Sequence, residues 1–233
     1  MDAARFATLC RPDGEGLPHP DPAPIRLQIL ITALSRAWAG VQRQMLASGD
    51  SLSALDEDQT TTLLIAWLEH LLDHEAIPGF SAEFYGVTRD AKVVNHDGHH
   101  PDKMPDVTFS LRPGLPGLPG TYSLHAECKP VGRQHGHAPY RGRDGMGCFI
   151  HGDYGCKTTL GLMIAYADPG YTFADKVLPA LSQGFGQPDD PHATTILPLP
   201  DIDPPSSSHR RIWHYANGNA PGDIRLLHIW LTR

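Results

Sequence analysis

The chain has 233 residues and a formal net charge of −7 with its histidines neutral; 40% of its residues are hydrophobic and 19% are charged. This length and composition are those of a globular protein with a sizeable core, and they exclude a disordered or low-complexity chain. A membrane-spanning protein is excluded as well, because no apolar run approaches the roughly 18–20 residues that cross a bilayer.

Residues 1–24 are rich in proline and glycine, which predicts an irregular N-terminal arm. The remainder, residues 25–233, predicts a single domain that begins with a helix over residues 25–47. Apolar residues recur there at intervals of three or four, the period of an amphipathic helix. The helix is expected to end at Ser48-Gly49-Asp50.

A second helix is predicted over residues 56–74. Asp56 is a favourable N-cap residue, and Gln59 follows three positions later, as in a capping box. Glu57 lies in the first turn, where a carboxylate interacts favourably with the helix dipole. That interaction is one interpretation of Glu57, and a second interpretation follows from the strands described below.

Residues 80–87 and 91–94 are β-rich and predict a first hairpin, joined by Thr88-Arg89-Asp90. Residues 95–103 then contain three histidines and two aspartates. Such groups can bind a transition metal, which would make the chain a zinc-binding regulatory module. Their spacing does not place them around one ion, so a polar loop is the favoured interpretation.

The most informative stretch is residues 104–129. It predicts two strands, 104–111 and 122–129, joined by a loop that holds three Pro-Gly pairs. Side chains alternate between the two faces of a strand, so Glu127 and Lys129 share the polar face of the second strand. Asp106 lies at the start of the first strand. Antiparallel pairing of the two strands would bring two carboxylates and one amine together.

These residue types suit one kind of chemistry. Carboxylate oxygens are ligands that Mg²⁺ prefers, so Asp106 and Glu127 are candidate metal ligands. A bound divalent ion lowers the pKa of a water and neutralises charge on a scissile phosphate. Lys129 would orient the attacking water or stabilise the charge that develops. The pattern therefore predicts metal-dependent hydrolysis, with ordinary surface charges as the alternative.

Pro105-Asp106, a gap of 20 residues and then Glu127-Cys128-Lys129 resemble the PD-(D/E)XK signature of the restriction-endonuclease-like nucleases. The resemblance implies an α/β fold with a central mixed β-sheet flanked by α-helices. It also implies Mg²⁺ as the cofactor, with Mn²⁺ as a substitute, and the backbone carbonyl of Cys128 as a further metal ligand. The implied function is that of a Mg²⁺-dependent DNA endonuclease in bacterial restriction or anti-phage defence.

The same resemblance gives Glu57 its second interpretation. Many nucleases of this superfamily carry a glutamate on the helix before the sheet, close enough to reach the metals. Glu57 looks like that residue, and Glu69 and Glu83 are its rivals. Its role as a metal ligand and its role as a solvated partner of the helix dipole both stay open at this point.

After Lys129 the chain becomes basic, with Arg133, Arg141 and Arg143 and the aromatic residue Tyr140. These side chains could clamp a nucleic-acid backbone, and a solvated loop is the alternative. Residues 145–155, GMGCFIHGDYG, together with the residues that follow them resemble bacterial nuclease-like proteins of restriction and phage-defence loci. Residues 157–167 predict a helix that packs on the sheet.

The C-terminal part predicts little regular structure before its last segment. Residues 168–208 are rich in proline, aspartate and serine, with one short strand expected at 194–199. Residues 223–233 are apolar on both faces of a strand, which predicts a buried strand that closes the sheet.

The negative charge is unfavourable for binding bare DNA, because phosphate contacts usually supply most of the affinity. We therefore expect a protein partner that delivers the DNA, or a homodimer. The four cysteines show no CxxC spacing and no signal peptide is evident, so a cytoplasmic location is expected. The residues leave two alternatives open: a nuclease for RNA or DNA repair intermediates, and a catalytically silent scaffold.

Overall fold

The computed structural model of the chain describes residues 11–182, 195–196 and 204–233. Its helices and single helical turns are α2 (Pro24–Ser48), the 3-10 turn η1 (Leu52–Ala54), α3 (Glu57–Asp73), α4 (Phe80–Glu83), α5 (Ala138–Arg141), α6 (Met146–Ile150), the π-helical turn η2 (Phe173–Val177) and α7 (Leu178–Ser182). Its strands are β1 (Phe84–Arg89), β2 (Val107–Leu111), β3 (Tyr122–Val131), β4 (Leu160–Ala167), β5 (Thr195–Ile196), β6 (Ser206–His209) and β7 (Ile224–Thr232).

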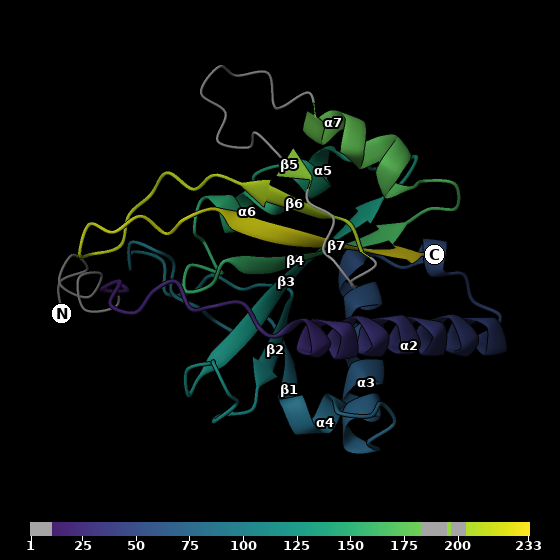
Figure 1. Cartoon of the computed structure of the whole chain (residues 1–233). Helices are drawn as coiled ribbons and strands as arrows, with labels where there is room; N and C mark the ends of the chain where they lie inside the picture. The colour runs from purple at the N-terminus through teal and green to yellow at the C-terminus, as the bar shows by residue number, and fades with distance from the viewer. Residues whose placement is uncertain (1–10, 183–194, 197–203) are drawn as a thin grey trace.

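These strands form one mixed sheet in the order β1-β2-β3-β4-β7-β6-β5 (Figure 1). The pairs β1–β2 and β2–β3 are antiparallel, β3–β4 and β4–β7 are parallel, and β7–β6 and β6–β5 are antiparallel again. The predicted α/β class with a central mixed sheet flanked by helices is confirmed. None of the helices in the described ranges has the length and apolar character that a membrane crossing requires.

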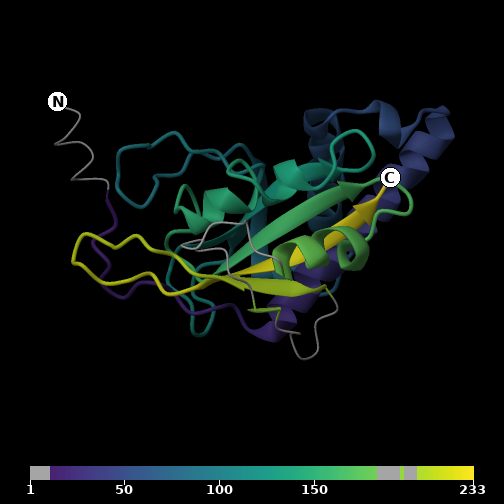
Figure 2. The same cartoon turned by 90° about the horizontal axis from the view of Figure 1, so that it is seen from above.

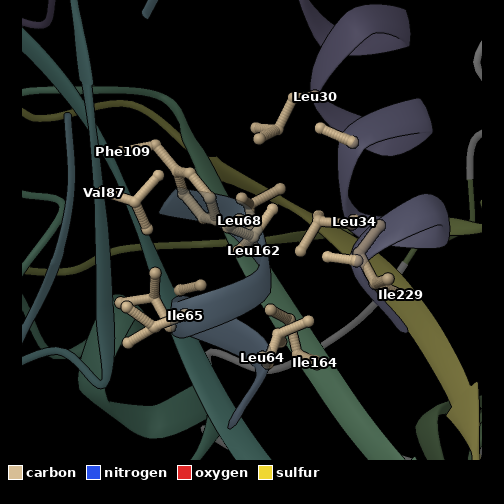
Figure 3. Packing of buried hydrophobic residues seen from close by; sticks show 14 of the residues in the cluster. Leu30, Leu34, Leu64, Ile65, Leu68, Val87, Phe109, Leu162, Ile164 and Ile229 are labelled. Carbon is tan, nitrogen blue, oxygen red and sulfur yellow. The ribbon is translucent and has the colours of Figure 1, made fainter. Parts of the chain in front are cut away.

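Helices cover both faces of the sheet (Figures 1 and 2). α2 and α3 pack on one face of the sheet and enclose a hydrophobic core with it. Leu34 of α2, Leu68 of α3 and Leu162 of β4 lie together in this core (Figure 3). On the opposite face, α5, α6, η2 and α7 bury side chains such as Phe149 and Phe173 against β4 and β7. The central strands are therefore shielded from water on both sides, as parallel strands generally are.

The two predicted long helices are confirmed, and their ends follow the local sequence. α2 begins with Pro24, whose fixed φ suits the first helical position, and ends at Gly49, whose φ of 77° is left-handed. α3 has Asp56 as its N-cap, and the side chains of Asp56 and Gln59 form the predicted capping box. This cap fixes the first turn of α3 and with it Glu57.

The predicted hairpin of residues 80–87 and 91–94 is wrong. Phe80–Glu83 form the short helix α4, and β1 follows and pairs with β2 instead. Asp90 has a left-handed φ of 51° and turns the chain out of the sheet after β1. Of the second predicted strand, Val93 makes one isolated bridge to Lys103.

The predicted helix over residues 157–167 is also wrong, because Leu160–Ala167 form the strand β4. All eight residues are buried, since α2 and α3 cover one face of β4 and the opposite helices cover the other. A strand that is apolar on both faces loses its alternation, and its apolar residues then also satisfy helical spacing.

The C-terminal prediction is confirmed in its main point. β7 is a buried strand, but it lies between β4 and β6 rather than at the edge of the sheet. β6 was not predicted; its Ser-Ser-Ser-His sequence is polar yet largely buried. The expected strand at 194–199 is described at β5 alone, and its other residues lie outside the described ranges.

The N-terminal arm is irregular as predicted, but its described part packs on the domain. His19 forms an isolated bridge with Thr158, next to the start of β4. Asp21 forms an ion pair with Arg225 of β7 and accepts a hydrogen bond of 2.6 Å from Thr159 Oγ1. Residues 11–23 therefore contribute contacts to the end of the sheet.

Candidate active site

Asp106 and the strand β3 meet where the β2–β3 ladder ends. The last ladder pair is Val107 with Ala126, so Asp106 lies just beyond the ladder, beside the next residues of β3. Its Oδ2 accepts a hydrogen bond of 2.7 Å from the backbone N–H of Cys128. The side chain of Asp106 thus occupies the position that a further strand residue would hold.

Lys129 is the centre of a group of four charged side chains. Its Nζ lies 2.8 Å from Glu127 Oε1 and 3.9 Å from Asp106 Oδ2. It also donates a hydrogen bond of 2.7 Å to Glu57 Oε1. The structure therefore brings together the three residues predicted from strand alternation and the glutamate predicted from the resemblance.

The three rival glutamates are now distinguished. Glu57 reaches Lys129 from the first turn of α3, although 72 positions separate the two in the sequence. Glu69 is exposed further along α3. Glu83 forms an ion pair of 2.7 Å with Arg26 of α2. Among these three, Glu57 is the one in the group around Lys129.

The backbone of Cys128 faces the same side as Asp106. In a β-strand the N–H and C=O of one residue point to the same neighbour, and the Cys128 N–H points to Asp106. Its carbonyl is therefore directed toward the end of β2, beyond the last ladder pair. Pro130, two residues on, faces that side too, and its missing N–H costs no ladder bond where no strand pairs.

Burial makes the two strand carboxylates hard to ionise. Glu127 is 5% exposed, and burial together with the nearby charge of Asp106 raises its pKa to about 8, against the opposing effect of Lys129. Burial likewise raises the pKa of Asp106 to about 6, although Lys129 and the Cys128 N–H favour its charged form. Burial on its own lowers the pKa of Lys129, but the carboxylates of Glu127 and Asp106 outweigh it and raise that pKa.

The charges of the group do not balance. Three carboxylates surround one ammonium, which leaves two negative charges when all are ionised. The available donors are carboxylate oxygens and one backbone carbonyl, a hard oxygen set that fits Mg²⁺ or Mn²⁺ better than a soft transition metal. Within the described part of the chain, no three His, Cys, Asp or Glu side chains are arranged to enclose an ion by themselves. A hard ion at this site would therefore keep several waters.

One predicted nucleic-acid contact is wrong. Tyr140 is 0% exposed; its ring packs in the core, and its hydroxyl bonds to His228 Nδ1 at 2.7 Å. A phenol ring in that position cannot stack on a base. Arg143 forms an ion pair with Asp153. The roles of Arg133, Arg141 and Arg143 in nucleic-acid binding stay predictions.

Two cavities lie on either side of the charged group along β3. One, of about 740 Å³, is lined by Glu57, Pro130 and Arg133 at the end of β3. The other, of about 350 Å³, is lined by residues near the start of β3, including His125, and by Lys92 and Lys157. Arginines line the first cavity together with carboxylates, Glu57 among them, and lysines line the second.

The histidines in the loop of residues 95–103 have different surroundings. His96 is half-buried, and its ring lies 4.8 Å from that of Trp213. Burial lowers the pKa of His96, while His99 and His100 are exposed. Among the described residues no three His, Cys, Asp or Glu side chains are grouped to hold an ion, and the interpretation as a polar loop stays a prediction.

One site residue was not predicted from the sequence. The hydroxyl of Tyr154 donates a hydrogen bond to Glu127 Oε2. Tyr154 belongs to the Gly-Asp-Tyr-Gly segment of residues 152–155. In the sequence, this segment stands out only through its resemblance to bacterial nuclease-like proteins. No local periodicity links it to Glu127, because the two residues are 27 positions apart.

Comparisons of the chain with protein-family models, with curated proteins and with solved structures give no match. The likeness to PD-(D/E)XK nucleases therefore stays a prediction that rests on the residues and their geometry.

Proposed function

We propose that this protein is a Mg²⁺-dependent nuclease of the restriction-endonuclease-like type that hydrolyses phosphodiester bonds in DNA. The observation that carries the proposal is the meeting of Glu57, Asp106 and Glu127 around Lys129. Glu57 comes from helix α3, Asp106 from the residue before β2, and Glu127 and Lys129 from β3. The predicted site is the only feature of the sequence that accounts for Glu57 lying beside the others. Ordinary surface charges would not require one of the carboxylates, Glu127, to be 5% exposed.

Asp106, Glu127 and the Cys128 carbonyl would hold the metal, and Glu57 would bind it directly or through water. When bound, the ion supplies a water of lowered pKa and neutralises charge on the scissile phosphate. Asp106 and Glu127 would both be ionised more readily with a cation bound, whereas burial opposes their ionisation. In our proposal Mg²⁺ is the natural ion and Mn²⁺ replaces it.

Lys129 would act on the substrate through its ammonium group. Glu57 and Glu127 hold this group at 2.7 and 2.8 Å, so its position is fixed before substrate binds. A fixed ammonium can donate to the attacking water or to a phosphate oxygen without reorganisation in the transition state. Its raised pKa keeps it a proton donor for hydrogen bonds, not a general base, near neutral pH.

The two cavities favour a polymeric substrate cut within the strand. About six residues of β3 separate His125 from Val131, which corresponds to roughly 20 Å. A nucleic-acid strand could therefore extend from Arg133 at one cavity to Lys157 at the other, across the carboxylates. This arrangement supports endonucleolytic action. We further propose a role in restriction or anti-phage defence, with a partner or a second copy that compensates for the acidic net charge.

Cleavage of supercoiled plasmid and linear duplex with Mg²⁺, Mn²⁺ or EDTA tests the proposal. We expect metal-dependent nicking by the wild type and a loss of about 100-fold or more in Asp106→Ala and Lys129→Ala. Glu69→Ala is the matched control on α3 and should cleave normally. Cleavage that survives both site substitutions, or that persists in EDTA, would refute the site.

A further inference from the structure

We infer, on the basis of the function proposed above, that Tyr154 is a positioning residue of the active site, which holds the Glu127 carboxylate in the orientation that binds the metal. The hydroxyl of Tyr154 donates to Glu127 Oε2, while Oε1 lies 2.8 Å from Lys129 Nζ. Two donors from different parts of the chain therefore hold the two oxygens of one carboxylate. Free rotation of that carboxylate about its last bond would break both contacts.

Tyr154 is itself held firmly in place. It is 3% exposed, and its ring meets the ring of Phe149 edge-on, with centroids 5.0 Å apart. Its neighbour Asp153 is anchored by Lys103 at 3.3 Å and by Arg143. These contacts fix the segment on both the buried and the exposed side, so the position of the hydroxyl is set by the fold rather than by Glu127.

The glycines on either side explain how the chain makes this turn. Gly152 has a φ of 72° and Gly155 a φ of 66°, both in the left-handed region that glycine adopts without strain. A Cβ at Gly152 would also lie 2.8 Å from the Trp213 ring. The two glycines of the Gly-Asp-Tyr-Gly segment therefore allow the turn that places Tyr154 beside Glu127.

The packing of Tyr154 requires its ring but not its hydroxyl. A phenylalanine would keep the contact with Phe149 and would avoid burying a polar group. The hydroxyl instead contacts Glu127, with the Cys148 thiol also within its reach. Replacing a residue that hydrogen-bonds to a metal ligand and orients it typically lowers metal affinity or activity by about 10–100-fold.

The experiment compares Tyr154→Phe with Tyr140→Phe. Both remove one hydroxyl from a buried tyrosine, but the Tyr140 hydroxyl bonds to His228 Nδ1 and to the Met163 carbonyl rather than to a carboxylate. The readouts are Mn²⁺ binding, followed by electron paramagnetic resonance or calorimetry, and the kcat and KM of plasmid cleavage. Circular dichroism and thermal unfolding show whether each variant is folded.

We expect Tyr154→Phe to weaken Mn²⁺ binding by about 10-fold or more and to lower kcat at a fixed metal concentration, with the KM for DNA unchanged. Tyr140→Phe should lose stability and keep the wild-type Mn²⁺ affinity. Equal Mn²⁺ affinity in wild type and Tyr154→Phe would overturn the positioning role while leaving the nuclease proposal intact. Absence of both Mn²⁺ binding and cleavage in the wild type would overturn both proposals together.

Should Tyr154→Phe unfold at the assay temperature, Phe149→Leu provides the second test. This substitution loosens the packing around Tyr154 and retains its hydroxyl. Mn²⁺ affinity that stays within about 2-fold of the wild type in a destabilised Phe149→Leu protein supports a role for the hydrogen bond. A loss of affinity of about 10-fold or more in a folded Phe149→Leu protein assigns the effect to packing and contradicts the inference.

Discussion

Glu127 is a residue at which the proposed function would cost stability. A buried carboxylate beside a second one is unfavourable in its charged form, and one ammonium does not compensate both. The metal-free protein therefore carries electrostatic strain that belongs to its proposed chemistry. Active-site substitutions that remove such strain commonly stabilise a protein while abolishing its activity.

Glu127→Gln should stabilise the metal-free protein at alkaline pH. Between the ordinary pKa of 4.5 and the folded-state value of about 8, the folded state binds a proton that the unfolded state has released. The stability of the wild type thus falls as pH rises through this window, and the variant lacks this loss. We expect the variant to gain about 2 kcal/mol over wild type between pH 6 and 8, measured by urea unfolding in EDTA. A difference that does not change with pH would contradict this prediction.

Glu57→Gln should reduce the cleavage rate by about 10–100-fold. Glu57 holds the Lys129 ammonium at 2.7 Å, and a neutral amide would hold it more weakly. The measurement is the cleavage rate at several Mg²⁺ concentrations. Glu69→Gln, an exposed residue on the same helix, serves as control; an equal loss in both variants would show that α3 as a whole, not the Glu57 carboxylate, is responsible.

At the scale of elements, the contact of α6 with β4 depends on one glycine. A Cβ at Gly161 would lie 2.6 Å from the Phe149 ring and 3.0 Å from Leu226 Cδ2. Phe149 is fully buried and belongs to the core on that face, so its ring has little room to move. Because residue 161 has no Cβ, α6 can approach the sheet closely. The segment that follows α6 carries Tyr154.

Gly161→Ala should therefore destabilise the protein by about 1–3 kcal/mol, the usual effect of overpacking a core. Gly86→Ala in β1 is the matched control, because a Cβ there would meet no atom within 4 Å. We expect Gly86→Ala to be neutral or slightly stabilising, since alanine has less backbone freedom to lose on folding. Chemical unfolding of both variants measures the difference. A Gly161→Ala protein as stable as Gly86→Ala would contradict the close packing.

Elements with a local pattern could be predicted, and elements defined by their surroundings could not. α3 has a cap and an apolar stripe of its own, and β3 alternates, so both were found. β4 was mistaken for a helix because burial on both faces removes alternation. β6 is polar in sequence, and its burial follows from Ser207 bonding to two histidines, His209 and His228.

The candidate site divides in the same way. Asp106 immediately precedes β2, and Glu127 and Lys129 lie on the neighbouring strand β3, so alternation and pairing predicted their proximity. Glu57 depended on the resemblance, because nothing local relates a helix start to a strand 72 positions later. Tyr154 was missed, since the turn that carries it is defined by glycines and by packing on Phe149, neither of which indicates a partner.

At the scale of the whole molecule, the sheet is joined by a buried polar network. His228 of β7 bonds through Nδ1 to Tyr140 at 2.7 Å and through Nε2 to Ser207 of β6 at 2.7 Å. Ser207 Oγ also lies 2.6 Å from His209 Nε2. Burial, together with the neighbouring His209, lowers the pKa of His228 to about 3. His228 is therefore uncharged in the folded protein, and its protonation at acidic pH would destabilise the network.

The stability of the protein should fall as the pH is lowered from about 6.5 toward 3. In this window the unfolded state binds a proton at residue 228 that the folded state does not accept. We expect His228→Gln to be less stable than wild type at pH 7, with the gap narrowing by about 2 kcal/mol at pH 4.5. Urea unfolding at both pH values measures it, and the exposed His99→Gln is the control. A constant gap would assign the acid loss to other groups.

The net charge of −7 applies to the whole surface, so favourable DNA contacts must be local. Arg133 at the cavity beside Glu57 is the candidate closest to the proposed site. We expect Arg133→Ala to weaken duplex binding and to reduce the slope of log affinity against log salt by about 1. Arg36→Ala, an exposed arginine on α2, is the control. An unchanged slope for Arg133→Ala would exclude a phosphate contact by this residue.

The ammonium of Lys129 among three carboxylates also bears on how the protein comes into being. A buried acidic site with no internal cation would need its metal in order to fold, as many small metal-dependent domains do. Here the chain supplies part of that positive charge itself, so we expect folding on the ribosome to proceed before any ion is captured. On the nuclease proposal, synthesis and activation are then separate events, because the folded chain would act on nucleic acid only after it has bound its metal.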